Sequence, residues 1–483
     1  MSRSNPTRRP LARAALWALV LGTVTGCTLS RIVRYRDPDA TDMSMFAKRT
    51  MRPAEVPYRF ARAPEMRSDL DTVRVRDPAT GRLVTFGEYQ AAARVLAFLV
   101  IHNDTIVYER YAPGFDSATV SNAFSVSKSA TSALVGIALA RGEIRSLDDS
   151  VARYVPELRG RAYGPVTIRQ LLDMRSGVRW REDEGSVLQR ASSDEARVYY
   201  TTDLHGLLRD LPREEPAGTR WRYKDTDAEV LGWVLERATG KPVATYMEEV
   251  LWRPMGAEHE GSWNLDRAGG HEKTSTGWNA TARDFAKLGR LYLNGGSWNG
   301  RQVVPAEWVA ASTTFDSTRR APEVATWFGM QHTNLWWQPM LPPHGDFFAD
   351  GSLGQRIYVQ PRTRTIIVQL ANSNQQDFPF RRIAAVAAGE RWDYPRPIPN
   401  LLLQALGAGG IDSARAVYRS ALEEMALHPE RYSISPQGMR AVAERIAEQG
   451  RAADAQEVLR WCRERFAGAA PCQTPLAPAR PQR

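Results

Sequence analysis

The residues with the clearest chemical potential are Ser125 and Lys128, which stand three positions apart at the start of an apolar stretch. Residues three apart share one face of a helix, so a helix here would bring the lysine amine beside the serine hydroxyl. Burial disfavours a charged ammonium, so we expect a neutral Lys128 that can take the proton of Ser125. The N–H groups and dipole of a helix N-terminus would stabilise negative charge near Ser125. The spacing therefore predicts an activated serine nucleophile.

The surroundings of Lys128 weigh against a purely structural alternative, in which Ser125 caps a helix and the lysine extends to the surface. Only six of the 64 basic residues are lysine, so lysine is an unusual choice in this sequence. Lys128 also falls within residues 126–139, the most apolar helical segment of the chain, which ends at Gly142. We therefore interpret Lys128 as functional.

A second chemical element is Tyr223, which lies just before a segment with helical periodicity. A tyrosine beside a serine and a lysine can pass a proton to a leaving group and later activate the attacking water. Two structural alternatives stay open. One is that the ring only fills the core, and the other is that Asp225 or Thr226 caps the helix, with Thr226 and Glu229 as a capping box.

The elements that would position these residues are strands at both ends of a largely helical segment. Residues 95–101 and 106–108 indicate a β-hairpin that turns at Asn103 and Asp104. Further strands are expected at residues 355–359 and 365–370, and helices at residues 126–139, 167–174 and 227–238. This order predicts an α+β domain whose antiparallel sheet is assembled from both ends of the segment, with helical insertions between them.

The N-terminus resembles an export signal. Arginines precede an apolar run at residues 11–24, which is too short to span a bilayer and is typical of a signal-peptide core. Residues 24–27, Val-Thr-Gly-Cys, resemble a bacterial lipobox, so we expect removal of residues 1–26 and a lipid on Cys27. A plain signal peptide cleaved nearby is the alternative. We expect residues 27–65 to be a tether with little core, because they mix charges, prolines and methionines without a clear period.

The C-terminal region, residues 395–483, has the pattern of amphipathic helices. Two apolar faces, one around Met439 and one around Val458, resemble a helical hairpin of the tetratricopeptide type. We expect this extension to pack on the catalytic body or to dock a protein partner of unknown identity. Cys462 and Cys472 could form a disulfide in an oxidising compartment, or Cys462 could simply belong to a helix face.

Several segments together resemble a known family, the serine hydrolases of the β-lactamase and penicillin-binding type. The resemblance is closest to class C β-lactamases, related esterases and the 6-aminohexanoate-dimer hydrolases, and it covers a hydrolase domain expected at residues 66–394. The resembling segments are residues 124–129 (FSVSKS), 146–149 (SLDD), 166–174 (VTIRQLLDM), 176–178 (SGV), 216–221 (PAGTRW) and 279–284 (NATARD). The resemblance implies a β-lactamase/transpeptidase-like antiparallel sheet with flanking helices and a helical subdomain, followed by the C-terminal helical extension.

The resemblance also implies roles for individual residues. In that family a serine is acylated, a lysine and a tyrosine exchange its proton, and two backbone amides form the oxyanion hole. Carried over, this makes Ser125 the nucleophile, Lys128 the base and Tyr223 the acid and base. The oxyanion donors would be the amide of Ser125 and, within the glycine-containing segment at residues 351–355, the amide of Ser352.

This sequence departs from the family at two motifs. Lys224 and Asp225 follow the tyrosine in place of the usual serine and asparagine, and the strand motif lacks its usual lysine. An anionic Asp225 would oppose a substrate carboxylate and suit a cationic substrate, so we predict negligible β-lactam hydrolysis. The residues expected to contact substrate are Asp225, Gly351, Gly354 and Tyr200. Tyr200 and its aromatic neighbours, Tyr199 and Trp180, could instead belong to ordinary core packing.

The remaining features exclude several classes of function. The net charge of +10 comes from arginines spread along the chain, so nucleic-acid binding is not expected. The seven histidines form no metal-binding motif and no nucleotide-binding glycine loop occurs, so we expect neither a metal nor an organic cofactor. We expect an exported enzyme, anchored through Cys27 on the periplasmic face of the bacterial outer membrane, that cleaves a small or short peptide-like amide or ester. The rival hypothesis is a catalytically weak protein that binds cell-wall peptide or presents its C-terminal helices to a partner.

Overall fold

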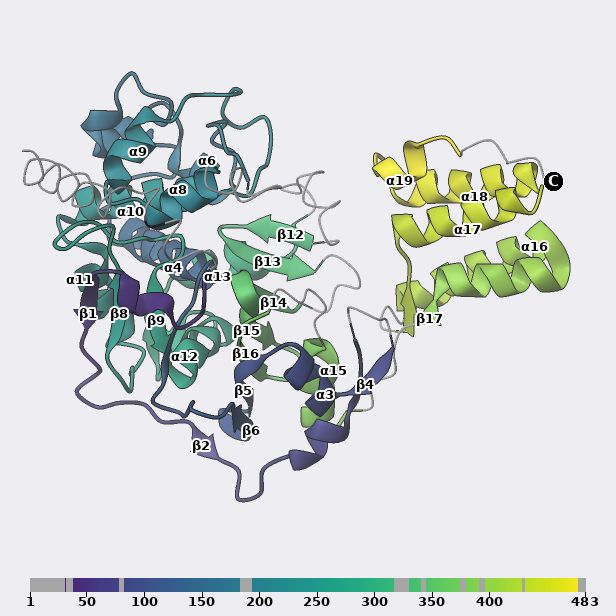
Figure 1. Ribbon diagram of the computed structural model, residues 1–483, viewed down its shortest axis with the longest axis horizontal. Helices are drawn as coiled ribbons and strands as arrows, with labels where there is room; N and C mark the ends of the chain where they lie inside the picture. The colour runs from purple at the N-terminus through teal and green to yellow at the C-terminus, as the bar shows by residue number, and fades with distance from the viewer. Residues whose placement is uncertain are drawn as a thin grey trace, which may run out of the picture.

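The computed structural model describes residues 31, 38–77, 82–182, 193–316, 330–339, 345–373, 379–390, 396–427 and 431–476. Cys27 and the predicted signal segment lie outside these residues. Two main sheets and the helices around them make up the body of the protein, and the C-terminal helices form a second group (Figure 1). The predicted α+β class is confirmed.

The larger sheet has eight strands and joins the two ends of the body. In spatial order the strands are β12 (Met330–Thr333), β13 (Trp336–Pro339), β14 (Phe347–Gly351), β15 (Gln355–Gln360), β16 (Thr365–Ala371), β5 (Val95–His102), β6 (Thr105–Tyr111) and β2 (Ala61–Arg62). Neighbouring strands are antiparallel except for β2 and β6. The predicted hairpin is β5–β6, and Asn103 and Asp104 both have positive φ at its turn.

Pairing of β16 with β5 closes this sheet between late and early parts of the sequence. His102 lies opposite Thr365, and Leu99 lies opposite Val368. Helices cover both faces of the sheet. Successive side chains of a strand point to opposite faces, so neighbouring residues meet different helices. Ile357 faces α12 (Ala282–Leu293), where Gly289 allows close approach, whereas its neighbour Tyr358 packs on Phe380 of α15 (Phe380–Ala387).

The smaller sheet corrects the expectation of a tether over residues 27–65. Its order is β1 (Lys48–Met51), β8 (Gly261–Asn264), β9 (Trp278–Thr281) and β7 (Val120–Asn122). Met51 and Phe60 are buried in the main core, and β1 pairs with β8, so a core segment begins well before residue 65. The sequence conceals it because the few apolar residues of this stretch become buried only against partners distant in the chain.

Two long helices lie at the centre of the body. α4 (Val126–Ala140) is buried on nearly every side, as its apolar sequence predicted, and it packs on α10 (Asp225–Thr239) and on β14. α10 ends at Gly240, whose left-handed φ of +68° favours glycine. Around them lie α5 (Val151–Tyr154), α6 (Ile168–Leu172), α8 (Asp194–Tyr200), α9 (Leu204–Asp210), α11 (Val243–Met247) and α13 (Ala306–Thr313), whereas α3 (Phe86–Ala92) packs beside β5.

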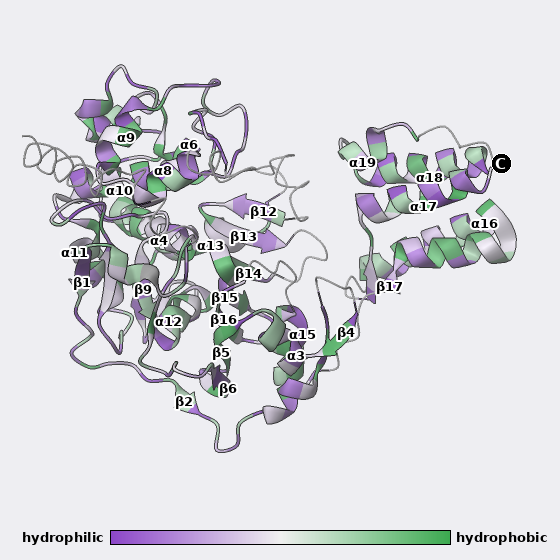
Figure 2. Cartoon of the chain, viewed as in Figure 1, coloured by the Kyte–Doolittle hydropathy of each residue, from purple (hydrophilic) through white to green (hydrophobic). Residues whose placement is uncertain are grey.

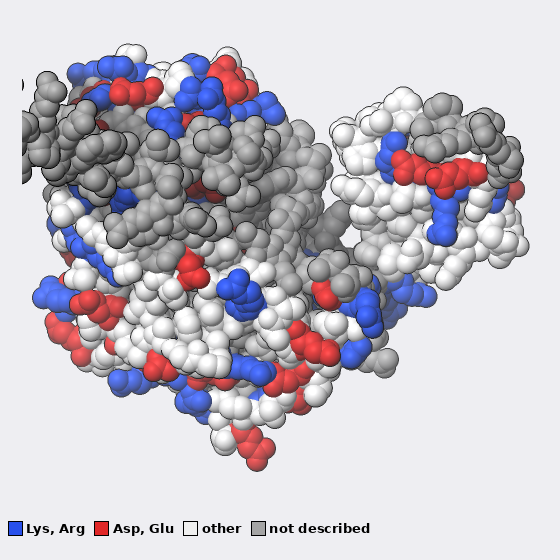
Figure 3. Space-filling view, viewed as in Figure 1, with Lys and Arg blue, Asp and Glu red and all other residues white. Residues whose placement is uncertain are grey.

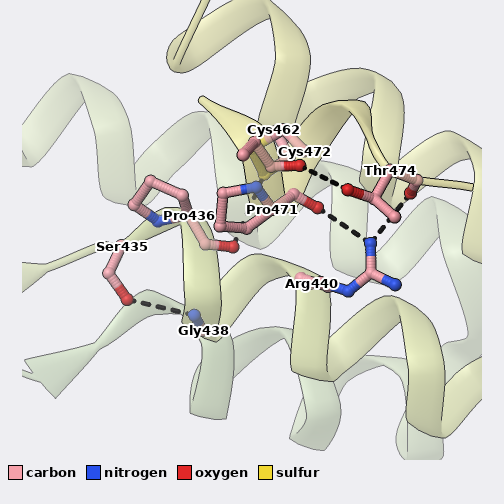
Figure 4. Close-up of a disulfide and its surroundings, with 9 residues drawn as sticks. Ser435, Pro436, Gly438, Arg440, Cys462, Pro471, Cys472 and Thr474 are labelled. Atoms are coloured by element: carbon pink, nitrogen blue, oxygen red, sulfur yellow. Dashed lines mark hydrogen bonds between the residues drawn. A yellow bond between two sulfur atoms is a disulfide. The ribbon is translucent and has the colours of Figure 1, made fainter. Parts of the chain in front are cut away.

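The C-terminal helices have a hydrophobic core of their own. They are α16 (Ile398–Leu427), α17 (Pro436–Glu448), α18 (Ala452–Arg465) and α19 (Ala470–Gln473), and each alternates polar and apolar residues (Figure 2). A disulfide joins Cys462 to Cys472, which confirms the pairing that the sequence allowed, and Arg440 donates hydrogen bonds to the carbonyls of Pro471 and Thr474 beside it (Figure 4).

Charges of both signs are mixed on the surface. Lysine and arginine side chains lie among aspartate and glutamate side chains on the face shown in Figure 3. Among the described residues, none of the helices combines the length and the apolar character that a membrane span requires.

Candidate active site

Ser125 lies at a sharp connection between a strand and the central helix. β7 ends at Asn122, and the next two residues turn the chain into α4, with Ser125 at its N-cap. Phe124 has a φ of +43°, an unusual value for a residue other than glycine. The Asn122 side chain supports the turn, because its oxygen accepts a hydrogen bond from the Phe124 N–H at 2.7 Å. The turn therefore presents Ser125 at the positive end of a buried helix.

Lys128 lies one helical turn further on and contacts three acceptors. Its Nζ donates to Ser125 Oγ at 2.7 Å, to Asp225 Oδ1 at 2.6 Å and to the Ser275 carbonyl at 3.3 Å. The side chain is only 2% exposed. These three acceptors match the three protons of an ammonium. The predicted contact between Ser125 and Lys128 is thus formed.

The charge of Lys128 differs from the expectation of a neutral amine. Burial disfavours the ammonium, but the Asp225 carboxylate and Tyr223 outweigh this effect and hold the pKa of Lys128 above its ordinary value. The resting lysine is therefore charged. Burial alone would favour a neutral amine, but the buried carboxylate of Asp225 reverses this effect.

Asp225 was predicted to contact a substrate, but it pairs with Lys128. Asp225 is the first residue of α10, so its carboxylate lies at a helix N-terminus and close to the Lys128 ammonium. The usual family residue at this place is uncharged. The charge of Asp225 is therefore largely balanced within the site, which weakens the argument that it selects a cationic substrate.

Tyr223 lies against the same lysine. The Lys128 Nζ is 4.8 Å from the centre of the tyrosine ring, and the ring packs against Trp337 and His332 at 5.6 and 5.7 Å. Burial raises the pKa of the Tyr223 hydroxyl and Lys128 lowers it, with a net pKa above the ordinary value. A protonated Tyr223 suits a residue that gives a proton to a leaving group.

The buried carboxylate of Glu229 holds the backbone at Ser275, whose carbonyl is the third hydrogen-bond partner of Lys128. Glu229 accepts hydrogen bonds from the backbone N–H groups of Thr274 and Ser275 at 2.8 and 3.2 Å. The alternative of a capping box between Thr226 and Glu229 is wrong, because α10 begins at Asp225 with Lys224 as its N-cap. Glu229 instead accepts from the N–H groups of Thr274 and Ser275. Its signal was present as an acidic residue at a buried position of a helix with apolar periodicity.

The glycine-containing segment lies beside the nucleophile. A Cβ on Gly351 would come within 2.5 Å of the Ala123 carbonyl and 3.1 Å of the Ser125 nitrogen, so only glycine fits at the end of β14. Ser352 opens the following turn. In the part of the chain that the structure describes, the amides of Ser125 and Ser352 donate to no acceptor. Both are therefore available to a substrate oxygen.

The other two predicted substrate contacts have packing partners. Gly354 has a φ of +87° in the turn before β15, and its carbonyl accepts a hydrogen bond from the Gln369 side chain at 3.0 Å. Tyr200 is buried in a small cluster with Phe124, which directly precedes Ser125. Trp180 belongs to the main core. Tyr200 thus matches the packing alternative and supports the turn that carries the nucleophile.

Two further groups of polar residues were not anticipated. Lys224 is buried and donates to Ser176 Oγ at 3.1 Å and to the Val178 carbonyl at 2.9 Å, away from the nucleophile. His205, Glu236 and His271 come together elsewhere in the helical subdomain. Their positions are too far apart in the sequence, and on too many elements, for any spacing rule to detect them.

Comparisons with known proteins identify the family and the fold. A family model described as Beta-lactamase matches residues 82–390. The 6-aminohexanoate-dimer hydrolase of Paenarthrobacter ureafaciens is 28% identical over 292 residues, which cover 57% of this chain and 72% of that protein. Esterase EstB of Burkholderia gladioli is 37% identical over 141 residues, 27% of this chain and 36% of the esterase. A solved structure from Bacillus anthracis, provisionally assigned as a 6-aminohexanoate-dimer hydrolase, superposes with a TM-score of 0.63 at 24% identity, over 72% of this chain and 91% of that one.

Proposed function

The chain belongs to the beta-lactamase family, and from this premise we propose that it is a serine hydrolase that cleaves an amide or ester bond through an acyl-Ser125 intermediate. The observation that carries the proposal is the 2.7 Å hydrogen bond between Lys128 Nζ and Ser125 Oγ at the N-terminus of a buried helix. A lysine held this close can exchange a proton with the serine without a large movement.

The first half of the proposed reaction acylates the serine. The neutral form of Lys128 takes the proton of Ser125 as Oγ bonds to the substrate carbonyl carbon. The carbonyl oxygen becomes an oxyanion that accepts hydrogen bonds from the amides of Ser125 and Ser352. The intermediate then collapses, the bond to the amine or alcohol breaks, and Tyr223 gives that leaving group its proton.

The second half returns the enzyme to its starting state. Tyr223, now deprotonated, takes a proton from water, and the hydroxide oxygen bonds to the acyl carbon. The bond between this carbon and Ser125 Oγ breaks, the acid leaves, and Oγ regains a proton from Lys128. No atom or electron is left over, so the cycle needs only substrate and water.

The ion pair with Asp225 sets the pH at which this reaction runs. Lys128 acts as a base only in its neutral form, and its raised pKa makes that form a minority at neutral pH. We therefore expect activity to rise with pH into the alkaline range. Loss of activity above neutral pH would contradict Lys128 as the base.

We base the proposed substrate class on two relatives and on one departure in the motifs. The relatives named 6-aminohexanoate-dimer hydrolase and Esterase EstB support linear amides and esters as substrates. The strand segment at Gly351 lacks the lysine that usually accompanies a β-lactam carboxylate in this family. We propose short linear amides and esters as substrates, with negligible turnover of β-lactams.

A fluorophosphonate probe tests the proposal directly, since it reacts only with an activated serine. The intact protein should be labelled, and Ser125→Ala and Lys128→Ala should not. Ser129→Ala is the matched control, because Ser129 lies in the same helix as Lys128 but its hydroxyl donates to the Leu335 carbonyl and not to Lys128. An unlabelled intact protein would favour the rival, a binding protein that retains the fold.

We also propose export and lipid attachment at Cys27. The disulfide between Cys462 and Cys472 supports this, since disulfides persist mainly in oxidising compartments. Cells grown with a labelled fatty acid should incorporate it into the protein, and Cys27→Ser should abolish incorporation and release the protein from the membrane fraction. Unchanged membrane attachment of Cys27→Ser would reject the lipid anchor.

A further inference from the structure

Two histidines and one glutamate converge where α9, α10 and the loop between β8 and β9 meet. His205 is the second residue of α9, Glu236 lies near the end of α10, and His271 lies in the loop between β8 and β9. One potential ligand atom from each lies within 4.8 Å of the others. His271 Nδ1 and Glu236 Oε2 are 2.8 Å apart. The fold therefore brings three ligand types that bind metals from three separate elements to one place.

A buried carboxylate fixes the relative position of the two histidine-bearing segments. Asp266 accepts hydrogen bonds from the N–H of Leu204 at 3.0 Å and from the N–H of His271 at 2.9 Å. A Cβ on Gly270 would lie 1.9 Å from the same carboxylate, so glycine is required there. Asp266 thus links the backbone at the start of α9 to the loop that carries His271.

The imidazole of His205 is held between two other rings. It stacks on Trp233 of α10 at 3.7 Å and on His271 at 3.5 Å. These two contacts fix the position of the imidazole beside the other two ligand groups.

The charges around the cluster permit a cation. Arg267 pairs with Asp266 at 3.0 Å, and Arg237 pairs with Glu157, so each nearby arginine has an acidic partner. Glu236 has no arginine or lysine partner among the ion pairs of the described residues, where its only partner is His271. The carboxylate can therefore offer its charge to an ion.

We propose that His205, Glu236 and His271 bind one divalent cation of the zinc class, with water completing the coordination. Two imidazoles and a carboxylate form a ligand set that such ions prefer. Tetrahedral zinc with bonds of 2.0–2.1 Å holds its ligands roughly 3.4 Å apart. The widest separation, at most 4.8 Å, must therefore close by up to about 1.4 Å, and the 2.8 Å between His271 Nδ1 and Glu236 Oε2 must widen. The two stacked imidazoles must also open, because their lone pairs have to converge on the ion.

An ion bound by these three residues would connect α9 to two elements of the active site. The ion would link α9, α10 and the loop at residues 265–277. The first residue of α10 is Asp225, and the loop carries the Ser275 carbonyl, so both elements contact Lys128. The inference rests on the three side chains alone and would stand if the proposed hydrolase activity failed.

Calorimetric titration of Zn²⁺ into the full chain, stripped with a chelator and free of any histidine tag, tests the site. We expect one ion per chain, and Co²⁺ should give the intense visible absorption of a tetrahedral complex. His205→Phe keeps a ring stacked on Trp233 but removes the ligand, and it should weaken binding at least about 10- to 100-fold, the loss that even outer-sphere changes produce.

Two more variants keep the test decisive. Glu236→Gln should weaken binding to a similar extent, and because Glu236 is only partly buried this variant should fold even if His205→Phe does not. His259→Ala removes a histidine outside the cluster and should bind as the intact protein does. Absence of binding to the intact chain, or affinities of His205→Phe and Glu236→Gln equal to that of the intact chain, would overturn the proposal.

Discussion

Asp225→Asn removes the negative charge that lies 2.6 Å from the Lys128 ammonium and leaves the shape of the side chain almost unchanged. Asparagine can still accept a hydrogen bond from Nζ. It cannot balance the charge, so burial acts on the lysine with less opposition and favours the neutral amine. The pKa of Lys128, which Asp225 holds above its ordinary value, should therefore fall.

The size of this fall can be estimated from the geometry. An opposite charge within about 4–6 Å shifts a pKa by about 1 to 3 units, and Asp225 lies well inside that range. Each unit corresponds to about 1.4 kcal/mol and to a tenfold change in the neutral fraction at a pH below the pKa. The neutral amine should thus become about 10- to 1000-fold more abundant at a fixed pH.

The assay is the pH dependence of kcat/KM with a p-nitrophenyl ester. The ascending limb of the profile reports the base of the free enzyme, so it should move about 1 to 3 pH units lower in Asp225→Asn. Asp225→Glu retains the charge and serves as the matched control, with a limb close to that of the intact protein. A thermal melt of each variant shows whether the fold is retained.

One result would refute this reasoning. If Asp225→Asn folds and hydrolyses the ester with an unchanged limb, the limb does not belong to a lysine that Asp225 controls. Lys128 would then not be the base whose titration limits the reaction.

Further predictions concern the oxyanion site, the second layer, the substrate and the C-terminal helices. Gly351→Ala should lower kcat/KM for a p-nitrophenyl ester at least about 100-fold, because its Cβ would displace the Ser125 turn and one oxyanion donor is worth about that much; wild-type kinetics would contradict the assigned approach. Glu229→Gln should lower the free energy of unfolding in urea by about 1 to 3 kcal/mol, since its NH₂ group cannot accept from the N–H groups of Thr274 and Ser275; a stability equal to that of the intact protein would argue against this contact. The intact protein should hydrolyse p-nitrophenyl esters and short linear amides with negligible turnover of a chromogenic cephalosporin, and turnover of the cephalosporin at ordinary β-lactamase rates would reject the substrate class. Cys462→Ser should destabilise the C-terminal helices by about 2 to 3 kcal/mol, with Ser125 labelling unchanged because those helices have a separate core; loss of labelling would show that the two parts depend on each other.

The sequence predicted the elements that repeat a clear period. The apolar run at α4, the hairpin of β5 and β6 and the late strands β15 and β16 were all expected close to their observed bounds, since strong periodicity and turn residues determine them locally. β1 escaped prediction, because its single fully buried residue, Met51, gains its environment from a distant partner strand.

The candidate site shows the same division. The contact of Ser125 with Lys128 follows from helical geometry and could be predicted, whereas the charge of Lys128 depends on Asp225, nearly a hundred positions away. Glu229 and the cluster around His205 also depend on tertiary contacts between separate elements. Sequence spacing carries no information about such contacts, so only the folded structure reveals them.

The pairing of β5 with β16 has a consequence for how the chain acquires its structure. Val100 lies opposite Ile367, so β5 lacks one of its two neighbouring strands until nearly the whole body has been synthesised. Contacts between residues so far apart slow folding, because a long loop must close before they form. A ribosome-bound chain that ends before β16 would expose the apolar edge of β5, and we expect such fragments to need chaperones and to aggregate without them.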